Sequence, residues 1–198
     1  CFGQMRDAGI SPDKVTYLCI LKACGIVGSL EIGEEIHAEV RKQGLLCKDV
    51  VLGNALVDMY SKCGSLKKAQ EVFEQLPVRD VVSWNTMITG YSQIGECESV
   101  FIIFDRMLGV GTRPDPTTFI IVLNACSRTG LHCKSQTYFE SMGKDYGIIP
   151  TVEHHGCMID LLSRAGHLGK AVTTIVGMPL RANVEVWRTL LDACRKWG

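Results

Sequence analysis

The chain has 198 residues, 46% of them hydrophobic and 21% charged, so it is long and apolar enough to bury a substantial core. Its 21 basic residues balance its 21 acidic residues, which disfavours a partner held only through a basic surface, such as bulk nucleic acid or an anionic membrane. No run approaches the roughly 18 apolar residues of a membrane span, and the first residues lack the features of a signal peptide. We therefore expect no membrane partner.

Glycines recur along the chain after short apolar segments, at intervals of 31 to 36 residues: Gly28, Gly64, Gly95, Gly130 and Gly166. The residue nine positions after each of these glycines is apolar in most of the units. These five residues form what we call the apolar column: His37, Phe73, Phe104, Phe139 and Ile175. The segments before the glycines have helical spacing, as Leu52, Leu56 and Met59 illustrate. This repetition predicts a series of similar units, each made of a first helix (helix A), a glycine turn and a second helix (helix B).

Prolines mark the ends of these units. Five of the six follow a helix B, where a residue without an N–H prevents the helix from continuing: Pro12, Pro77, Pro114, Pro150 and Pro179. Helix pairs of this size cannot bury a face alone, so neighbouring pairs must share one core. Because no long segment alternates with period two, the sequence predicts an all-α stack of helix-turn-helix repeats and no sheet.

The ten cysteines are spread through the chain without any C-x-x-C pair. Several lie within apolar helical patterns, as Cys24 does in Leu21-Lys22-Ala23-Cys24. Free cysteine behaves as a small hydrophobic residue, whereas disulfide frameworks are typical of short secreted chains. We therefore expect buried free thiols in a reducing compartment.

Three segments carry the motifs of a known repeat family: Asn54-Ala-Leu-Val-Asp-Met-Tyr-Ser-Lys-Cys-Gly64, Val82-Ser-Trp-Asn-Thr-Met-Ile-Thr-Gly-Tyr-Ser92 and Glu153-His-His-Gly-Cys-Met-Ile-Asp-Leu-Leu-Ser-Arg-Ala-Gly166. With its units of variable length, two of which end in Pro-Asp (Pro12-Asp13 and Pro114-Asp115), the chain resembles pentatricopeptide repeat proteins of the land-plant PLS subclass. The resemblance implies a right-handed α-solenoid of stacked helix-turn-helix repeats, with helix A on the concave side.

These motifs divide the chain into seven parts. They are a helix B tail of a preceding repeat (1–13), a long repeat (14–49), a short repeat (50–80), a standard repeat (81–115), a long repeat (116–151), a terminal short repeat (152–183) and the start of an E-type extension (184–198). Since the first part begins in helix B and the last contains one helix, we expect the chain to be a fragment of a longer protein.

The resemblance implies binding of single-stranded organelle RNA, with one base read by each repeat. In the family, the fifth and last residues of each motif read the base. The pairs here are Leu18 with Asp49, Asn54 with Asp80, Asn85 with Asp115, Ile120 with Thr151, and Gly156 with Asn183. The two Asn–Asp pairs resemble the uracil-reading combination, whereas Leu18, Ile120 and Gly156 depart from the code.

The chemistry of an Asn–Asp pair is suited to reading a base. An amide offers a donor and an acceptor together, and a carboxylate can accept a hydrogen bond from the amide and fix its orientation. The alternative interpretation is that Asn54 and Asn85 are helix N-caps.

Two further columns follow from the resemblance. The second motif residue is expected to sandwich the base at Val15, Val51 and Val82, with Thr117 and Glu153 as departures; ordinary packing at a helix start is the alternative.

The thirteenth residue is basic in three of five motifs, and these residues are candidates for phosphate contacts: Lys62, Arg128 and Arg164. A solvated helix face is the alternative for them. So few cations predict a shallow salt dependence.

Catalytic motifs are weak. His37-Ala38-Glu39 has the H-x-E form of zinc deaminases, but the chain lacks the P-C-x-x-C partner, and His37 belongs to the apolar column. The adjacent residues of the pair His154-His155 point in different directions on a helix. With no G-x-S-x-G motif, P-loop or G-x-G-x-x-G motif in context, we expect no enzyme, no cofactor and no metal in this chain.

The resemblance favours a specificity factor for C-to-U RNA editing in a mitochondrion or chloroplast. The segment Val184-Glu-Val-Trp187, at the start of the E-type extension, would recruit or precede a deaminase or another editing factor. One alternative is an RNA stabilisation or splicing factor without editing, and another is a tetratricopeptide-like protein-binding scaffold. The scaffold would require a constant period of about 34 residues and a W-x2-L-G-x2-Y signature, and neither is present.

Overall fold

The computed structural model describes residues 3, 5, 9, 11–178 and 184–197. Within these residues the secondary structure is helical and no strand occurs. None of the described helices combines the length and the apolar character that crossing a membrane requires. The expected helix B tail at 1–13 falls largely outside the described residues.

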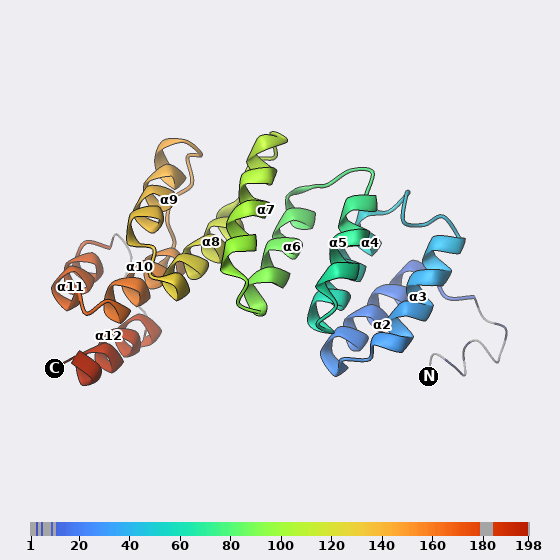
Figure 1. The fold of residues 1–198 in the computed structure, drawn as a ribbon, viewed down its shortest axis with the longest axis horizontal. Helices are drawn as coiled ribbons and strands as arrows, with labels where there is room; N and C mark the ends of the chain where they lie inside the picture. The colour runs from blue at the N-terminus through green and yellow to red at the C-terminus, as the bar shows by residue number, and fades with distance from the viewer. Residues whose placement is uncertain (1–2, 4, 6–8, 10, 179–183, 198) are drawn as a thin grey trace. The chain divides into compact units, whose positions relative to one another are not determined.

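The helices follow one another in pairs along the chain (Figure 1). The pairs are α2 (Lys14–Val27) with α3 (Leu30–Lys42), α4 (Val50–Lys62) with α5 (Leu66–Gln75), α6 (Val81–Gln93) with α7 (Cys97–Gly109), α8 (Pro116–Thr129) with α9 (His132–Lys144), and α10 (Val152–Arg164) with α11 (Leu168–Val176), followed by α12 (Val184–Trp197). In each pair, helix A begins at the first residue of a sequence repeat.

The five repeated glycines lie in the turns between helix A and helix B. Each has a positive φ, between 68° and 83°, a conformation that glycine adopts at little cost because it has no Cβ. At the end of α2, for example, the Gly28 N–H donates to the Cys24 carbonyl oxygen at 2.8 Å, as is common at helix C-termini. The predicted glycine turns are confirmed.

The chain divides into two compact units, residues 1–94 and 95–198, with the division in the turn after α6. In the first unit α2 packs against α4, and α4 against α6, while α5 contacts both α4 and α6. Phe73 from α5 meets Trp84 from α6 edge-on, with ring centroids 4.9 Å apart. Both side chains are almost fully buried, so consecutive repeats share one apolar core.

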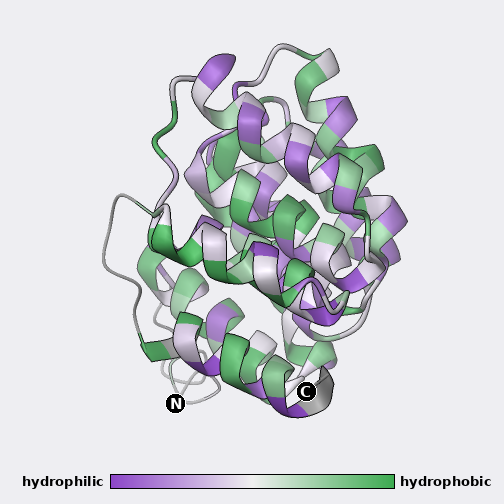
Figure 2. Cartoon of the chain, turned by 90° about the vertical axis from the view of Figure 1, so that its left-hand side faces the viewer, coloured by the Kyte–Doolittle hydropathy of each residue, from purple (hydrophilic) through white to green (hydrophobic). Residues whose placement is uncertain are grey.

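The second unit is built in the same way, with α8 against α10 and α10 against α12. Phe104 and Phe119 form an edge contact between α7 and α8, with centroids 6.0 Å apart. Val186 and Leu190 of α12 join a buried cluster with Ile159 of α10. Apolar and polar residues alternate around individual helices (Figure 2), as expected when each helix has one buried face.

Each of the nine described cysteines is a free thiol. Cys24, Cys97, Cys126 and Cys157 are buried, but the expectation of burial is wrong for four others, which are exposed: Cys19, Cys47, Cys133 and Cys194. Cys47 lies between helices, and the other three lie on helix sides that the core leaves uncovered. Sequence periodicity alone does not assign so small a residue to one side of a helix.

Candidate nucleic-acid interface

The predicted base-reading asparagines lie one turn into helix A of their repeats. Asn54 is the fifth residue of α4 and Asn85 the fifth residue of α6, and each side chain is 8% exposed. Both lie beyond the first turn, so the interpretation as N-caps is wrong.

The N-caps are instead the residues that end the preceding motifs: Asp49 for α4, Asp80 for α6, Asp115 for α8 and Thr151 for α10. The Asp80 carboxylate, for example, accepts from the Ser83 backbone N–H at 2.8 Å. A carboxylate at this position satisfies a backbone donor that the helix leaves unpaired. The terminal residues of these four motifs therefore have a structural role of their own.

Asn54 and Asp80 are brought together although they are 26 residues apart in the chain. The Asn54 amide nitrogen donates to Oδ1 of Asp80 at 3.4 Å. Burial acts to raise the pKa of Asp80, but hydrogen bonds from Ser83 and Asn54 outweigh it and hold the pKa below its usual value. The charged carboxylate thus orients the amide, while the buried Oδ1 of Asn54 has no hydrogen-bond partner within the described residues.

The two residues of the second Asn–Asp pair, Asn85 and Asp115, belong to different compact units. Asn85 belongs to the first unit and Asp115 to the second. Within its own unit, Asp115 forms a capping box with Thr118: its carboxylate accepts from the Thr118 N–H at 2.8 Å, and its own N–H donates to the Thr118 hydroxyl at 3.1 Å.

The long repeats lack a polar fifth residue, as the sequence indicates. Leu18 and Ile120 are both half-buried. The terminal residue of the first long repeat is engaged elsewhere, since Asp49 forms an ion pair with Lys14 at 2.5 Å. The hydrogen bond from Lys14 is the main reason that the pKa of Asp49 lies below its usual value.

In the second unit, Thr151 interacts with the side chains of Glu153 and His154. Gly156 is half-buried and carries no side chain, and its predicted partner Asn183 lies outside the described residues.

The three predicted sandwiching residues are exposed valines. Val15, Val51 and Val82 are 63%, 48% and 53% exposed. Ordinary packing at a helix start would have buried these side chains, so the structure does not support that alternative. Thr117 and Glu153, the departures at this position, are also exposed.

Two predicted phosphate contacts, Lys62 and Arg164, have carboxylate partners one helical turn away on their own helices. Lys62 pairs with Asp58 at 2.6 Å, and Arg164 pairs with Asp160 at 2.8 Å. Arg128 is exposed on α8. The carboxylates at i−4 offset part of the positive charge of Lys62 and Arg164. These residues should therefore attract phosphates less strongly than unpaired cations would.

Asn124, a polar residue on the same side of α8 as Ile120, was not identified from the sequence. Asn124 lies one turn after Ile120 on α8 and is exposed. Its Oδ1 accepts a hydrogen bond from the Cys157 thiol of α10 at 3.2 Å. The i, i+4 spacing from Ile120 was visible in the sequence, but the thiol partner required the packing of α8 against α10.

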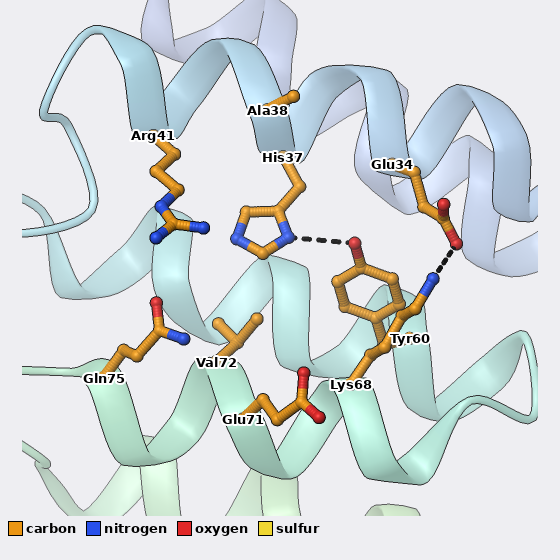
Figure 3. Close-up of a pocket in the computed structure, with 9 residues that line it drawn as sticks. All are labelled: Glu34, His37, Ala38, Arg41, Tyr60, Lys68, Glu71, Val72 and Gln75. Carbon is orange, nitrogen blue, oxygen red and sulfur yellow. Dashed lines mark hydrogen bonds and ion pairs between the residues drawn. The ribbon is translucent and has the colours of Figure 1, made fainter.

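The H-x-E fragment does not form a site. His37 faces a cavity of about 270 Å³ between α3, α4 and α5, where its Nδ1 lies 2.9 Å from the Tyr60 hydroxyl (Figure 3). Glu39 instead lies near Gln43, whose amide donates to it at 3.4 Å. Burial, with a smaller contribution from Arg41, lowers the pKa of His37, which favours the neutral imidazole.

The adjacent histidines also diverge. His154 is fully buried and its Nε2 contacts the Pro116 carbonyl oxygen at 2.9 Å, whereas the His155 ring packs edge-on against Phe139. Among the described residues, no three His, Cys, Asp or Glu side chains gather closely enough to hold a metal ion.

The fold is an all-α solenoid of helix-turn-helix repeats, and it matches known structures. The structure of the pentatricopeptide repeat protein PPR10 in complex with an 18-nt psaJ RNA element aligns with a TM-score of 0.77 at 21% identity, over 97% of this chain and 27% of that chain. The predicted fold class is confirmed.

Three family models match the chain. Those described as pentatricopeptide repeat domain, PPR repeat and PPR repeat family match residues 1–48, 54–81 and 79–128, respectively. Together the matches cover more than half of the chain, which belongs to the pentatricopeptide repeat family.

Curated relatives from Arabidopsis thaliana match nearly the whole chain. Pentatricopeptide repeat-containing protein At5g56310 is 44% identical over 192 residues, which are 97% of this chain and 36% of the relative. The relative named pentatricopeptide repeat-containing protein At2g03880, mitochondrial, is 45% identical over 98% of this chain and 30% of the relative. The chain thus spans about a third of the length of these relatives.

Proposed function

We propose that this chain binds single-stranded RNA, one base to a repeat, and acts as a binding module without chemistry of its own. The observation that carries the proposal is the Asn54 amide, held at 3.4 Å by the carboxylate of Asp80, the N-cap of α6. Exposed Val51 lies one turn before it on the same side of α4. The RNA complex of the related fold supports the same function.

Uracil is the base we assign to the repeats at 50–80 and 81–115. The Asn–Asp pair resembles the family's uracil-reading combination, and an amide fixed by a carboxylate retains an N–H that can donate to a carbonyl oxygen of uracil. Two consecutive repeats with this pair should prefer two adjacent uracils.

The biological role that we infer is that of a specificity factor for C-to-U editing of organelle transcripts. The motifs resemble the PLS subclass, and α12 forms a helix where the E-type extension is expected. That extension would bring a deaminase or another editing factor to the RNA. One relative named mitochondrial supports an organelle location. RNA stabilisation or splicing without editing is the second candidate.

The first test replaces one reading residue and measures base preference. Asn54→Thr with Asp80 intact should move the preference at that nucleotide from uracil toward guanine, because a hydroxyl with a terminal Asp resembles the family's purine-reading pair. Binding to U-U and G-U oligonucleotides is compared at fixed salt, since phosphate contacts change affinity without changing preference. A change of roughly 1–3 kcal/mol in the relative affinity is expected.

The matched control is Asn85→Thr, measured with a U-G oligonucleotide as well, which should change the preference for the second uracil and leave the first unchanged. If Asn54→Thr weakens both RNAs equally, Asn54 supports the fold and reads no base. If the wild-type chain ignores RNA and captures a helical peptide instead, the scaffold alternative replaces the proposal.

A further inference from the structure

The second long repeat lacks a polar side chain at the position where the neighbouring repeats carry asparagine. Ile120, the fifth residue of α8, is half-buried and cannot form a hydrogen bond with a base edge. Four residues later on the same side of the helix stands Asn124, the ninth residue of α8. Residues at i and i+4 lie one above the other on one helix face, so Asn124 presents an amide one turn further along that face.

Asn124 is held in place by the next helix A. The Cys157 thiol of α10 donates to Oδ1 of Asn124 at 3.2 Å, and the same sulfur lies 4.0 Å from the Ile120 carbonyl oxygen. Cys157 is 7% exposed, and burial, with a smaller contribution from Asp160, raises the pKa of its thiol to about 12. The thiol therefore remains protonated at neutral pH and is a permanent donor.

This donor determines which way the carboxamide faces. The thiol lies closer to Oδ1 of Asn124 than to the Ile120 carbonyl oxygen, so the oxygen of Asn124 faces Cys157 and the amide nitrogen lies on the other side of the group. The side chain is exposed, and among the described residues no hydrogen bond engages its nitrogen. Its two N–H groups are thus directed away from the protein contact and are available to an outside acceptor.

The ninth residue of the short repeat at 50–80 has a different environment. Asp58 of α4 is neutralised by Lys62 at 2.6 Å, and in that repeat the fifth residue, Asn54, carries the amide. The amide therefore lies at the fifth position in α4 and at the ninth position in α8.

We propose that Asn124 replaces Ile120 as the base-reading residue of the repeat at 116–151, with Cys157 as its positioning residue. The inference rests on the proposed RNA-binding function. Since Asn124 offers N–H donors, it selects bases with a carbonyl oxygen at the edge it meets. Uracil and guanine have such an oxygen, whereas adenine has an amino group at the equivalent place.

The test uses the 198-residue chain, labelled with nitrogen-15, and three RNAs that contain 5′-UUN-3′ and differ only at N, which is U, G or A. This order follows the orientation that the family resemblance implies, with the N-terminal repeat toward the 5′ end of the RNA. Titration is followed by the amide signals, which detect weak binding and report the Asn124 side chain directly. We expect these side-chain signals to shift and saturate with U and G, and the Kd to be roughly five-fold higher with A, the lower end for a base contact.

Two variants and one control complete the test. Asn124→Ala should bind the three RNAs equally, and Asn124→Asp should reverse the preference toward adenine because a carboxylate only accepts. Gln136→Ala, an exposed change on α9, should leave the preference unchanged.

Unchanged preference in both Asn124 variants would overturn the assignment of Asn124. If the wild-type chain distinguishes the UU step but not N, this inference alone is wrong; if it binds none of the RNAs, the proposed function fails.

Discussion

A single buried histidine shows how closely these repeats depend on individual hydrogen bonds. His154 Nδ1 accepts from the Thr151 backbone N–H at 3.1 Å, and its Nε2 lies 2.9 Å from the Pro116 carbonyl oxygen. Because the carbonyl can only accept, Nε2 carries a proton, and because Nδ1 accepts from an N–H, Nδ1 carries none. The imidazole ring is therefore neutral. A second proton would face the Thr151 N–H and break the contact at the start of α10. Burial, the largest influence, lowers the pKa of His154.

The stability of the protein should therefore decrease as the pH falls. A histidine whose folded pKa lies below its unfolded value binds more protons when unfolded, so its contribution to stability is present at pH values above about 6.5 and is lost as the pH falls below that value. Urea unfolding between pH 7.5 and 5.5 should show a falling midpoint, to which His37 and His155 also contribute because burial lowers their pKa values. His154→Gln should reduce this slope; identical slopes would contradict the role of His154.

At the scale of whole helices, the approach of helix A to helix B depends on small residues. A Cβ built on Gly53 of α4 would come within 2.2 Å of Cδ2 of Leu76, which follows α5 and is 3% exposed. Gly156 of α10 is also within a helix, but a Cβ there would meet only Val186 Cγ2 at an ordinary 3.9 Å. The two glycines have equal helix propensity but different surroundings.

Alanine should therefore have opposite effects at the two positions. Gly156→Ala is expected to stabilise the chain by about 0.5–1 kcal/mol through helix propensity alone. Gly53→Ala gains the same propensity but forces buried Leu76 to move, at a cost of about 1–3 kcal/mol, so the net effect is destabilising. The free energy of unfolding from urea titration is the measurement. Equal stabilisation in both variants would show that Leu76 repacks freely.

The cysteines of the whole molecule act as separate packing or surface residues. The nine described cysteines are free thiols on several different helices and in two connections, at Cys47 and Cys63. Burial raises the pKa of Cys126 to about 11 and that of Cys157 to about 12. A thiol reacts with alkylating agents as thiolate, so these two residues should be the least reactive.

Reductant should leave the melting temperature unchanged, because packing holds the described parts of the chain without disulfides. A fall of many degrees in reductant would reveal a bridge. Native alkylation followed by peptide mass spectrometry should label the exposed cysteines first: Cys19, Cys47, Cys133 and Cys194. Early labelling of Cys126 or Cys157 would contradict their burial.

The sequence by itself determined the features that depend on neighbouring residues. Helices with a spacing near 3.6 residues, turns at Gly28 and its equivalents, and the apolar column at Phe73 and Phe104 follow from local periodicity and from the left-handed conformation that glycine allows. The repeat interval then predicted stacking, since one helix pair cannot cover its own apolar face. The motif resemblance placed Asn54 beside Asp80, and the structure contains that contact.

Only the tertiary structure decided which polar groups are available on helix A. The Lys14–Asp49 ion pair and the Asn124–Cys157 hydrogen bond join residues 35 and 33 positions apart, and such pairs depend on how far one helix is shifted along the next. Burial of a small residue such as cysteine likewise depends on which neighbour covers it. Local periodicity carries no information about that shift, so the partners of the polar side chains on helix A become visible only when the repeats are stacked.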